Sequence, residues 1–319
     1  MTSEKVVRVS DITRQEWLAV RRTGLGGSDA ACVMGLNPFR SRLELYADKK
    51  GMIPDKEDNE AMRIGRDLEE YVAKRFTEAT GKKVRRNNFM YRSIENPFMI
   101  ADIDREVDGE NAGLECKTTR NFERNDYDTG NIPLIYYVQC VHYMAVRNYD
   151  RMYLAVLVLG KGFYWFKIDR NESEETALIA QERAFWNLVQ NGTPPEGDGT
   201  ESAETACTTI CGLVAEEKEI DPVNLCEYDG DFRLLDVLTA ESKELDLKIN
   251  AIKERIKLKM GDNPSGWSAN YSVTYKTQTR STIDSAKLKA NFPQAYAACT
   301  KQSTTRILKY KERKQNDNL

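Results

Sequence analysis

The segment 100–118 holds side chains whose types and spacing could hydrolyse a phosphodiester bond. If the chain turns back around Gly109–Asn111, Asp104 faces Glu115 on the adjacent strand. Lys117 follows Glu115 by two residues, so both side chains leave the same face of that strand. The carboxylates could then hold Mg²⁺, which polarises the phosphate and lowers the pKa of a bound water, while the lysine orients or deprotonates that water.

The same pattern has a plainer interpretation and one internal alternative. A solvated hairpin with cross-strand charge pairs would show the same pattern. Charged residues make up 30% of the chain, so such a short pattern can arise without a catalytic role. Asp102 has the same strand parity as Asp104, so alternation by itself leaves either aspartate as the candidate. The interpretation therefore depends on what the flanking elements supply.

Two predicted helices flank this segment, and each carries one further candidate. Apolar residues recur at helical spacing through 61–80, and a glycine directly follows, which predicts an amphipathic helix. This helix bears Glu69, with Glu70 as the alternative. A second helix is predicted over 135–147 and bears Gln139.

Short strands separated by turn residues lie between and after these helices. The element order α, β, β, β, α, β, β, α predicts an α/β fold, a sheet with helices packed on it. The predicted strands are 84–92, 98–107, 113–118, 152–159 and 163–168, and a last helix is predicted over 173–190.

The composition excludes several other kinds of site. Lys plus Arg number 47 against 50 Asp plus Glu, a net charge of -3, so bulk charge identifies no partner. A single histidine, His142, leaves little room for a histidine-rich metal site or a Ser-His-Asp triad. We expect His142 to be buried beside the site rather than to bind a ligand.

The sequence also predicts where the protein works. The longest apolar run, Tyr153–Leu159, is far shorter than the ~18 residues that a membrane span requires. The first residues lack the apolar stretch of a signal peptide. Seven cysteines without a CxxC pair are typical of reduced thiols. We therefore expect a cytoplasmic protein with no membrane partner.

Charge and composition predict three parts of the chain. Residues 196–246 carry a net charge of -12, and residues 276–319 carry +7. Prolines, glycines and acids gather between Asn191 and Pro222, as in linkers. The predicted parts are a core domain at 1–195, an acidic linker at 196–231 and an accessory region at 232–319.

The accessory region is predicted to begin with a long helix. From Leu235 to Ile256 the apolar residues follow a heptad pattern, so the helix over 232–260 must pack against another helix. A hairpin within the chain or a lid on the core is favoured over self-association. A strand over 271–279, a short helix and a basic tail are predicted to follow.

A glycine-rich run near the N-terminus, Gly24–Ser28, is a candidate phosphate contact. It lacks the Gly-Lys-Ser/Thr ending of a nucleotide P-loop, so ATP binding is not expected. We expect a tight turn whose amides meet a phosphate, with Ser28 as the N-cap of a helix. Basic residues close to Glu69 could form a phosphate-tracking surface. They are Arg63, Arg66, Lys74, Lys82, Lys83, Arg85 and Arg86.

The order of the candidate residues resembles the PD-(D/E)XK nuclease superfamily: Glu on a helix, Asp on a strand, Glu-x-Lys on the next strand and Gln on the next helix. The run RRTGLGGSDA at 21–30, followed by GLNPF at 35–39, looks more specifically like the YqaJ-type viral recombinases, relatives of the lambda exonuclease. The resemblance covers about residues 14 to 190. The block WSANYSVTYKTQTRSTID, followed by FPQAY, is similar to the tail of phage members. Ile103-Asp104 replaces the usual acidic-proline pair, which weakens the motif as a stand-alone signal.

The resemblance implies a fold and a role for each matching position. The fold would be a restriction-endonuclease-like core, with a central mixed sheet flanked by helices, and a mainly helical C-terminal accessory region. Asp104, Glu115 and Glu69 would bind or orient a metal, Lys117 would be the catalytic lysine, and Gln139 would support the nucleophile or a metal-bound water. Arg22 and Ser28 match a motif that helps to hold the phosphate at a DNA end.

The resemblance also implies an activity and partners. The activity would be that of a Mg²⁺-dependent exonuclease, with Mn²⁺ as a substitute, that digests one strand of linear double-stranded DNA from 5' to 3'. The partners would be DNA ends, a phage single-strand annealing protein and further copies in a ring trimer. The gene would belong to a phage or prophage and the protein to the cytoplasm of the bacterial host. The alternatives are a structure- or site-specific endonuclease on the same core and a non-catalytic DNA-end-binding adaptor.

Overall fold

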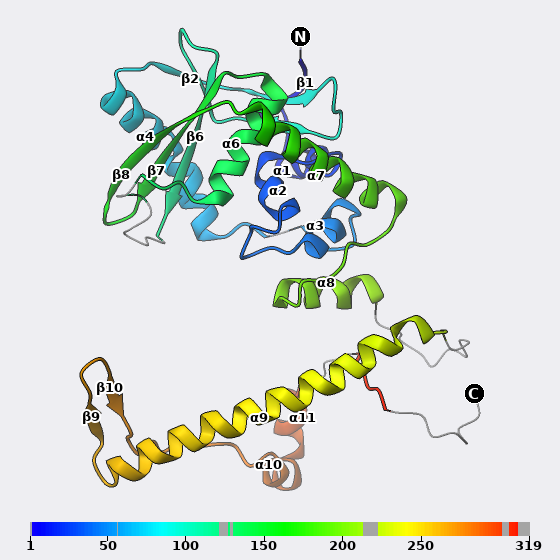
Figure 1. Cartoon of the computed structure of the whole chain (residues 1–319), viewed down its shortest axis with the longest axis vertical. Coiled ribbons are helices and arrows are strands. Elements are labelled where there is room, and N and C mark those ends of the chain that lie inside the picture. The colour runs from blue at the N-terminus through cyan, green and yellow to red at the C-terminus, as the bar shows by residue number, and fades with distance from the viewer. Residues whose placement is uncertain are drawn as a thin grey trace. The chain divides into compact units, whose positions relative to one another are not determined.

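The chain forms two compact units, Met1–Gly212 and Leu213–Leu319. The computed structural model describes residues 2–55, 57–120, 127, 130–212, 223–301 and 306–311. The first unit is an α/β body and the second is mainly helical (Figure 1).

The first unit alternates helices with short strands in the order that the sequence predicts for its central part. Its strands are β1 (Ser3–Arg8), β2 (Val84–Arg86), β3 (Phe89–Ser93), β4 (Ile100–Asp102), β5 (Arg105–Val107), β6 (Ala112–Thr119), β7 (Arg151–Val158) and β8 (Gly162–Asp169). Its helices are α1 (Arg14–Arg22), α2 (Gly27–Val33), α3 (Arg42–Lys49), α4 (Glu60–Thr80), α6 (Leu134–Arg147), α7 (Glu172–Asn191) and α8 (Glu201–Cys211), with a 3-10 turn η1 (Val9–Asp11).

The central sheet has five strands in the order β2-β5-β6-β7-β8. Strands β6 and β7 are parallel, and the other neighbours are antiparallel. A parallel pair needs a crossover connection, which here contains α6. The predicted α/β fold class, a central mixed sheet flanked by helices, is confirmed.

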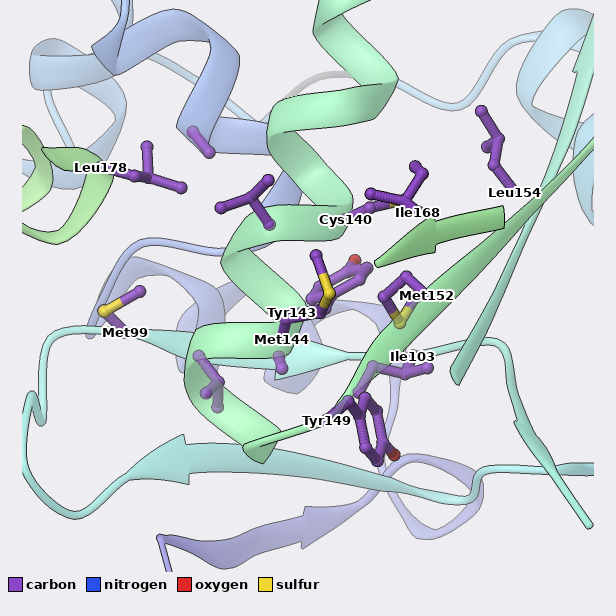
Figure 2. Close-up of a cluster of buried hydrophobic side chains, with 14 of the residues drawn as sticks. Met99, Ile103, Cys140, Tyr143, Met144, Tyr149, Met152, Leu154, Ile168 and Leu178 are labelled. Atoms are coloured by element: carbon purple, nitrogen blue, oxygen red, sulfur yellow. The ribbon is translucent and has the colours of Figure 1, made fainter. Parts of the chain in front are cut away.

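Alternation along the strands gives the sheet two apolar faces. On one face Val72 and Phe76 of α4 pack against Leu114 and Tyr153. On the other face, residues of α6 pack against Met152, Leu154 and Val156 of β7 (Figure 2). Because side chains alternate along β6, Leu114 faces α4 while its neighbour Glu115 faces α6.

The predicted helices of this unit are confirmed, and α4 shows why. Apolar residues at helical spacing bury Val72, Ala73 and Phe76 against the sheet. Asn59 caps the first turn through its side chain, and Gly81 ends the helix in the left-handed region with φ 73°.

The predicted strands 84–92 and 98–107 are each divided in two, which corrects the sequence prediction. β2 pairs with β5 in the central sheet, whereas β3 pairs with β4 in a separate three-stranded sheet, β1-β3-β4. The chain passes from one sheet to the other at Asn87 and Asp104, where the Asn87 amide donates to the Asp104 carbonyl at 3.2 Å. Alternation with a period of two marks extended chain, but it does not show where a strand leaves one sheet for another.

Helix α8 lies inside the segment predicted as an acidic linker. Ala203 and Ala206 of α8 are buried, and Ser202 Oγ lies 3.0 Å from Ser41 Oγ at the start of α3. Residues 201–211 therefore belong to the first unit.

The second unit contains α9 (Asp229–Met260), which confirms the predicted long helix. A 3-10 turn η2 (Cys226–Tyr228) precedes it, and β9 (Ser265–Trp267), β10 (Ser272–Thr274), α10 (Ser285–Asn291) and α11 (Pro293–Cys299) follow. The predicted strand 271–279 is thus reduced to three residues paired in a hairpin. Among the described residues of the whole chain, no helix combines the length and apolar character needed to cross a bilayer.

Candidate active site

Strand β6 and helix α6 bring three of the predicted residues into direct contact. Glu115 is buried, and Lys117 Nζ lies 2.6 Å from its Oε1 atom. Gln139 Nε2 donates to the same oxygen at 2.6 Å. The second oxygen, Oε2, is buried, and no residue in the described part of the chain forms a hydrogen bond with it. Two donors thus hold one carboxylate oxygen, while the other has no donor from the described residues.

Asp104 directly precedes β5 and stands beside β6. The β5–β6 register pairs Arg105 with Leu114, which sets Asp104 next to Glu115, as the predicted hairpin turn requires. Asp104 Oδ2 accepts a hydrogen bond from the Cys116 amide at 2.7 Å. Asp102, the alternative aspartate, instead accepts the Trp17 indole N–H at 2.8 Å.

Glu69 and Glu70 of α4 both bind one buried arginine. Arg105 is 3% exposed, and its guanidinium pairs with Glu69 and, at 2.9 Å, with Glu70 Oε2. The Glu69 side chain is 23% exposed and that of Glu70 is 83% exposed. Glu69 is thus the less exposed of the two, and its charge adds to the burial and the Glu115 charge that raise the pKa of Asp104.

Helix α2 carries the N-terminal motif against α6. A Cβ atom on Gly27 would lie 2.5 Å from the Tyr143 ring and 3.0 Å from Gln139 Cγ, so only glycine allows this approach. Tyr143 in turn accepts a hydrogen bond from Gln139 Nε2 at 3.0 Å. The glycine-rich motif is therefore next to the residue that holds Glu115.

Ser28 lies in the first turn of α2 and is not its N-cap, which corrects that prediction. The N-cap is Gly26, whose amide donates to Asp29 Oδ2 at 2.9 Å. Arg21 Nη2 donates to Ser28 Oγ at 2.7 Å. Asp29 lies behind them and pairs with the buried Lys49 at 2.7 Å.

The structure does not bring Arg22 to Ser28. Arg22 pairs with Asp55 and, at 3.5 Å, with Asp48. With Lys49 and other residues it lines a separate cavity of about 420 Å³. The arginine at the serine is Arg21, one residue earlier.

The sequence of this chain is similar to those of known proteins. The model of the YqaJ-like viral recombinase domain matches residues 16–150. The Uncharacterized protein YqaJ of Bacillus subtilis (strain 168) is 35% identical over 314 residues, which make up 97% of this chain and 98% of that protein. The chain belongs to the YqaJ-like viral recombinase family.

Two solved structures are similar to the YqaJ-like chain over 56% of its length. An alkaline exonuclease from Laribacter hongkongensis is 20% identical, with a TM-score of 0.48 and 93% of that chain covered. A phage related exonuclease from Haemophilus somnus 129PT is 12% identical, with a TM-score of 0.42 and 100% of that chain covered.

Family membership supports a nuclease, and the site of this YqaJ-like chain has the electrostatics that a nuclease needs. Burial raises the pKa of Asp104 well above its usual range, and the charges of Glu115 and Glu69 raise it further. Burial also raises the pKa of Glu115, against the effect of Lys117. The carboxylates repel each other in a place shielded from water, so a cation between them would be favoured.

Lys117 responds in the opposite way. Burial by itself would lower the pKa of its ammonium group, but the charges of Glu115 and Asp104 raise it above the ordinary value. Lys117 is therefore a fixed positive charge at neutral pH. As an ammonium ion beside Glu115, Lys117 is placed to orient a water.

The donor set of the YqaJ-like chain fits a small hard cation. Among the residues that the structure describes, no three His, Cys, Asp or Glu side chains gather as a metal-binding group. Mg²⁺ commonly uses only one or two protein carboxylates and keeps several waters or substrate oxygens. Asp104 and Glu115 supply such a pair, and the unpartnered Glu115 Oε2 is an oxygen that a cation would satisfy.

Sequence reasoning missed three residues that shape this site: Arg21, Arg105 and Tyr143. Arg21 and Arg105 act through contacts with residues across a turn or far away in the chain, which spacing does not reveal. Tyr143 follows Gln139 by four residues on α6, and this helical spacing could have indicated their contact. The single histidine behaves as predicted, because His142 is fully buried and its ring nitrogens contact Glu182 Oε1 at 2.8 Å and the Ile100 carbonyl at 2.9 Å.

Most of the basic residues predicted to form a DNA surface are engaged in ion pairs. Arg66 pairs with Asp58, and Lys82 pairs with Glu110. Arg63, Lys74 and Arg85 likewise contact carboxylates on their own or neighbouring elements. Those contacts are on the surface, where such pairs are weak, so these residues can still turn to phosphates.

Proposed function

We propose that this protein is a divalent-metal-dependent exonuclease that digests one strand of linear double-stranded DNA. The observation that carries the proposal is the contact set around Glu115, in which Lys117 and Gln139 hold one oxygen and the other has no donor from the described residues. Family membership supports the same conclusion.

Each residue has a role that follows from its position. Asp104 and Glu115 would hold Mg²⁺, and Glu69 would add negative charge from α4. The metal, when bound, polarises the scissile phosphate and lowers the pKa of a bound water. Lys117 supplies a fixed positive charge that orients this water and stabilises the charge that develops on the phosphate. Gln139 keeps the Glu115 carboxylate in one orientation.

The N-terminal motif fits the end of a DNA strand. Arg21 and Ser28 offer a guanidinium and a hydroxyl that already lie 2.7 Å apart, and they flank the first turn of α2. A terminal 5' phosphate carries nearly two negative charges and suits such donors. We therefore assign the phosphate contact to Arg21 and Ser28, where the sequence suggested Arg22 and Ser28.

This assignment favours digestion from the 5' end, which leaves 3' overhangs. Such overhangs are the substrate of a phage single-strand annealing protein, the partner that the family resemblance implies. The same proposal places the protein in the cytoplasm of a bacterial host, as the product of a phage or prophage gene.

A cleavage assay on linear and covalently closed circular DNA tests this function. We expect Mg²⁺ or Mn²⁺ to support digestion of linear DNA to single strands, and Ca²⁺ or EDTA to abolish it. Glu115→Gln and Lys117→Ala should each lower the rate by at least about 10²-fold, because each removes a charge from the reacting centre. Exposed residues of the same types provide matched controls, Glu78→Gln on α4 and Lys167→Ala on β8.

The other outcomes identify the alternatives. Cleavage of closed circles would indicate an endonuclease, since an exonuclease needs an end. End binding without cleavage in any metal would indicate a non-catalytic adaptor. Equal rates with EDTA present would refute metal dependence, and full activity of either active-site variant would refute the assignment of these residues.

A further inference from the structure

The second unit exposes a row of aliphatic side chains along α9. Six residues at heptad spacing, from Leu235 to Ile256, form what we call the α9 seam. They are Leu235, Leu238, Leu245, Ile249, Ile252 and Ile256, and between 40% and 58% of each is exposed. A helix that presents such a stripe normally buries it against another helix.

The spacing of the α9 seam is that of a two-stranded coiled coil. Leu235 and Leu238 occupy consecutive a and d positions, and the pattern continues without a break in register through Ile256. Only Ser242 interrupts the aliphatic run. The seam spans about three heptads, which is the shortest length at which such a repeat indicates a coiled coil.

Charge along α9 is divided between its two halves. The first half, 229–246, holds six acidic and two basic residues, and the second half, 247–260, holds five basic and one acidic residue. A second copy of the helix running in the opposite direction would set each acidic half against a basic half. A copy running in the same direction would set like charges together.

The positions that flank the seam give the same answer residue by residue. Consider an antiparallel pair in the register that sets Leu238 against Ile249 of the partner subunit. Glu241 then faces Lys248 of the partner subunit, and the two-fold symmetry of the pair repeats this contact. In a parallel pair, Glu241 would instead face Asp246 of the partner subunit, and Lys248 would face Lys253 of the partner subunit. Both parallel contacts are repulsive.

We propose that α9 pairs with α9 of a second copy of this chain as an antiparallel coiled coil. The occupant of the seam is thus another molecule of the same protein, chosen by charge complementarity along the helix. In the structure Lys248 contacts Glu244 of the same helix at 2.6 Å. Both side chains are about two-thirds exposed, so this ion pair is weak, and Lys248 can contact Glu241 of the partner subunit instead. The proposal does not depend on the nuclease assignment.

Sedimentation velocity of the full chain over a range of concentrations tests the pairing. Since α9 would join copies in pairs, we expect an even number of chains, which for ring trimers means two rings joined through α9. We expect Leu245→Asp in the seam to halve the mass of the assembly. Because Leu245 is 58% exposed, this change does not empty a core of the folded chain. A monomer at all concentrations, an odd-numbered assembly, or one that ignores Leu245→Asp would overturn the proposal.

Charge reversal tests the direction without touching the seam. Glu241→Lys should raise the dissociation constant of the α9 pairing roughly tenfold, since two attractive contacts become repulsive, and adding Lys248→Glu should restore it. Glu254→Lys, on the side of α9 away from the seam, is the matched control and should have little effect. Tighter assembly by Glu241→Lys would indicate a parallel pair and would refute the antiparallel one.

Discussion

The close approach of Gly27 to α6 leads to a sharp prediction. Gly27 has an ordinary backbone conformation, so Gly27→Ala is limited only by space. The new Cβ atom would lie 2.5 Å from Tyr143 Cε1 and 3.0 Å from Gln139 Cγ, whereas ordinary contacts begin at 3.4 Å. The tyrosine ring must therefore move by roughly 1 Å, and the side chain that holds Glu115 must move with it.

The expected magnitude follows from this overlap. Overpacking of this kind costs about 1–3 kcal/mol of unfolding free energy. Each kcal/mol of lost unfolding free energy lowers the melting temperature of a unit of 212 residues by roughly 2–4 °C. Because Gln139 positions Glu115, a displacement of about 1 Å should also lower the cleavage rate by up to ~10²-fold.

Thermal unfolding and single-turnover cleavage of linear DNA measure the two effects. Gly65→Ala is the matched control, since its Cβ meets nothing within 4 Å on α4, and it should be neutral or slightly stabilising. Tyr143→Leu removes the ring that the new methyl group strikes, so stability losses in the double variant should be less than additive. A Gly27→Ala protein as stable and as active as the wild type would refute the packing that we describe between α2 and α6.

Three further predictions concern the DNA end, pH and salt. Arg21→Ala should erase a preference for 5'-phosphorylated over 5'-hydroxyl DNA ends, while Arg22→Ala should keep this preference. A competition assay between the two kinds of end measures it. The reverse result would show that Arg22, and not Arg21, contacts the phosphate. Burial would lower the pKa of His142, but the negative charge of Glu182 raises this pKa above its ordinary value of 6.5. The stability that the His142–Glu182 pair contributes is therefore complete below pH 6.5, and it is lost as the pH rises through the raised pKa of the folded protein. Urea unfolding from pH 6 to 9 should show this loss in the wild type and a flatter profile in His142→Gln; identical profiles would contradict it. Truncation after Gly212 removes the tail of charge +7 and should make log Kd for DNA less dependent on log salt, by roughly 0.9 per lost phosphate contact, whereas an unchanged slope would show that the tail makes no DNA contact.

Local patterns in the sequence predict much of this protein. Helical spacing and a following glycine predict α4, and a two-residue separation places Glu115 and Lys117 on one face of β6. The turn near Gly109 predicts the register that brings Asp104 beside Glu115. These features depend on periods of 3.6 and 2 residues and on turn chemistry, which a short stretch of sequence carries by itself.

Contacts between distant residues were decided only by the tertiary structure. Parity could not distinguish Asp102 from Asp104, but their contacts in the structure differ. The Trp17 indole binds Asp102, and the Cys116 amide binds Asp104. Arg21 and Arg22 are the same residue type, so the sequence could not show which of them contacts Ser28. Neighbouring residues of a helix point about 100° apart, and the packing of α1 against α2 determines that Arg21 makes this contact. Helix and strand periods specify the face on which a side chain lies, whereas its partner depends on how elements far apart in the chain pack together.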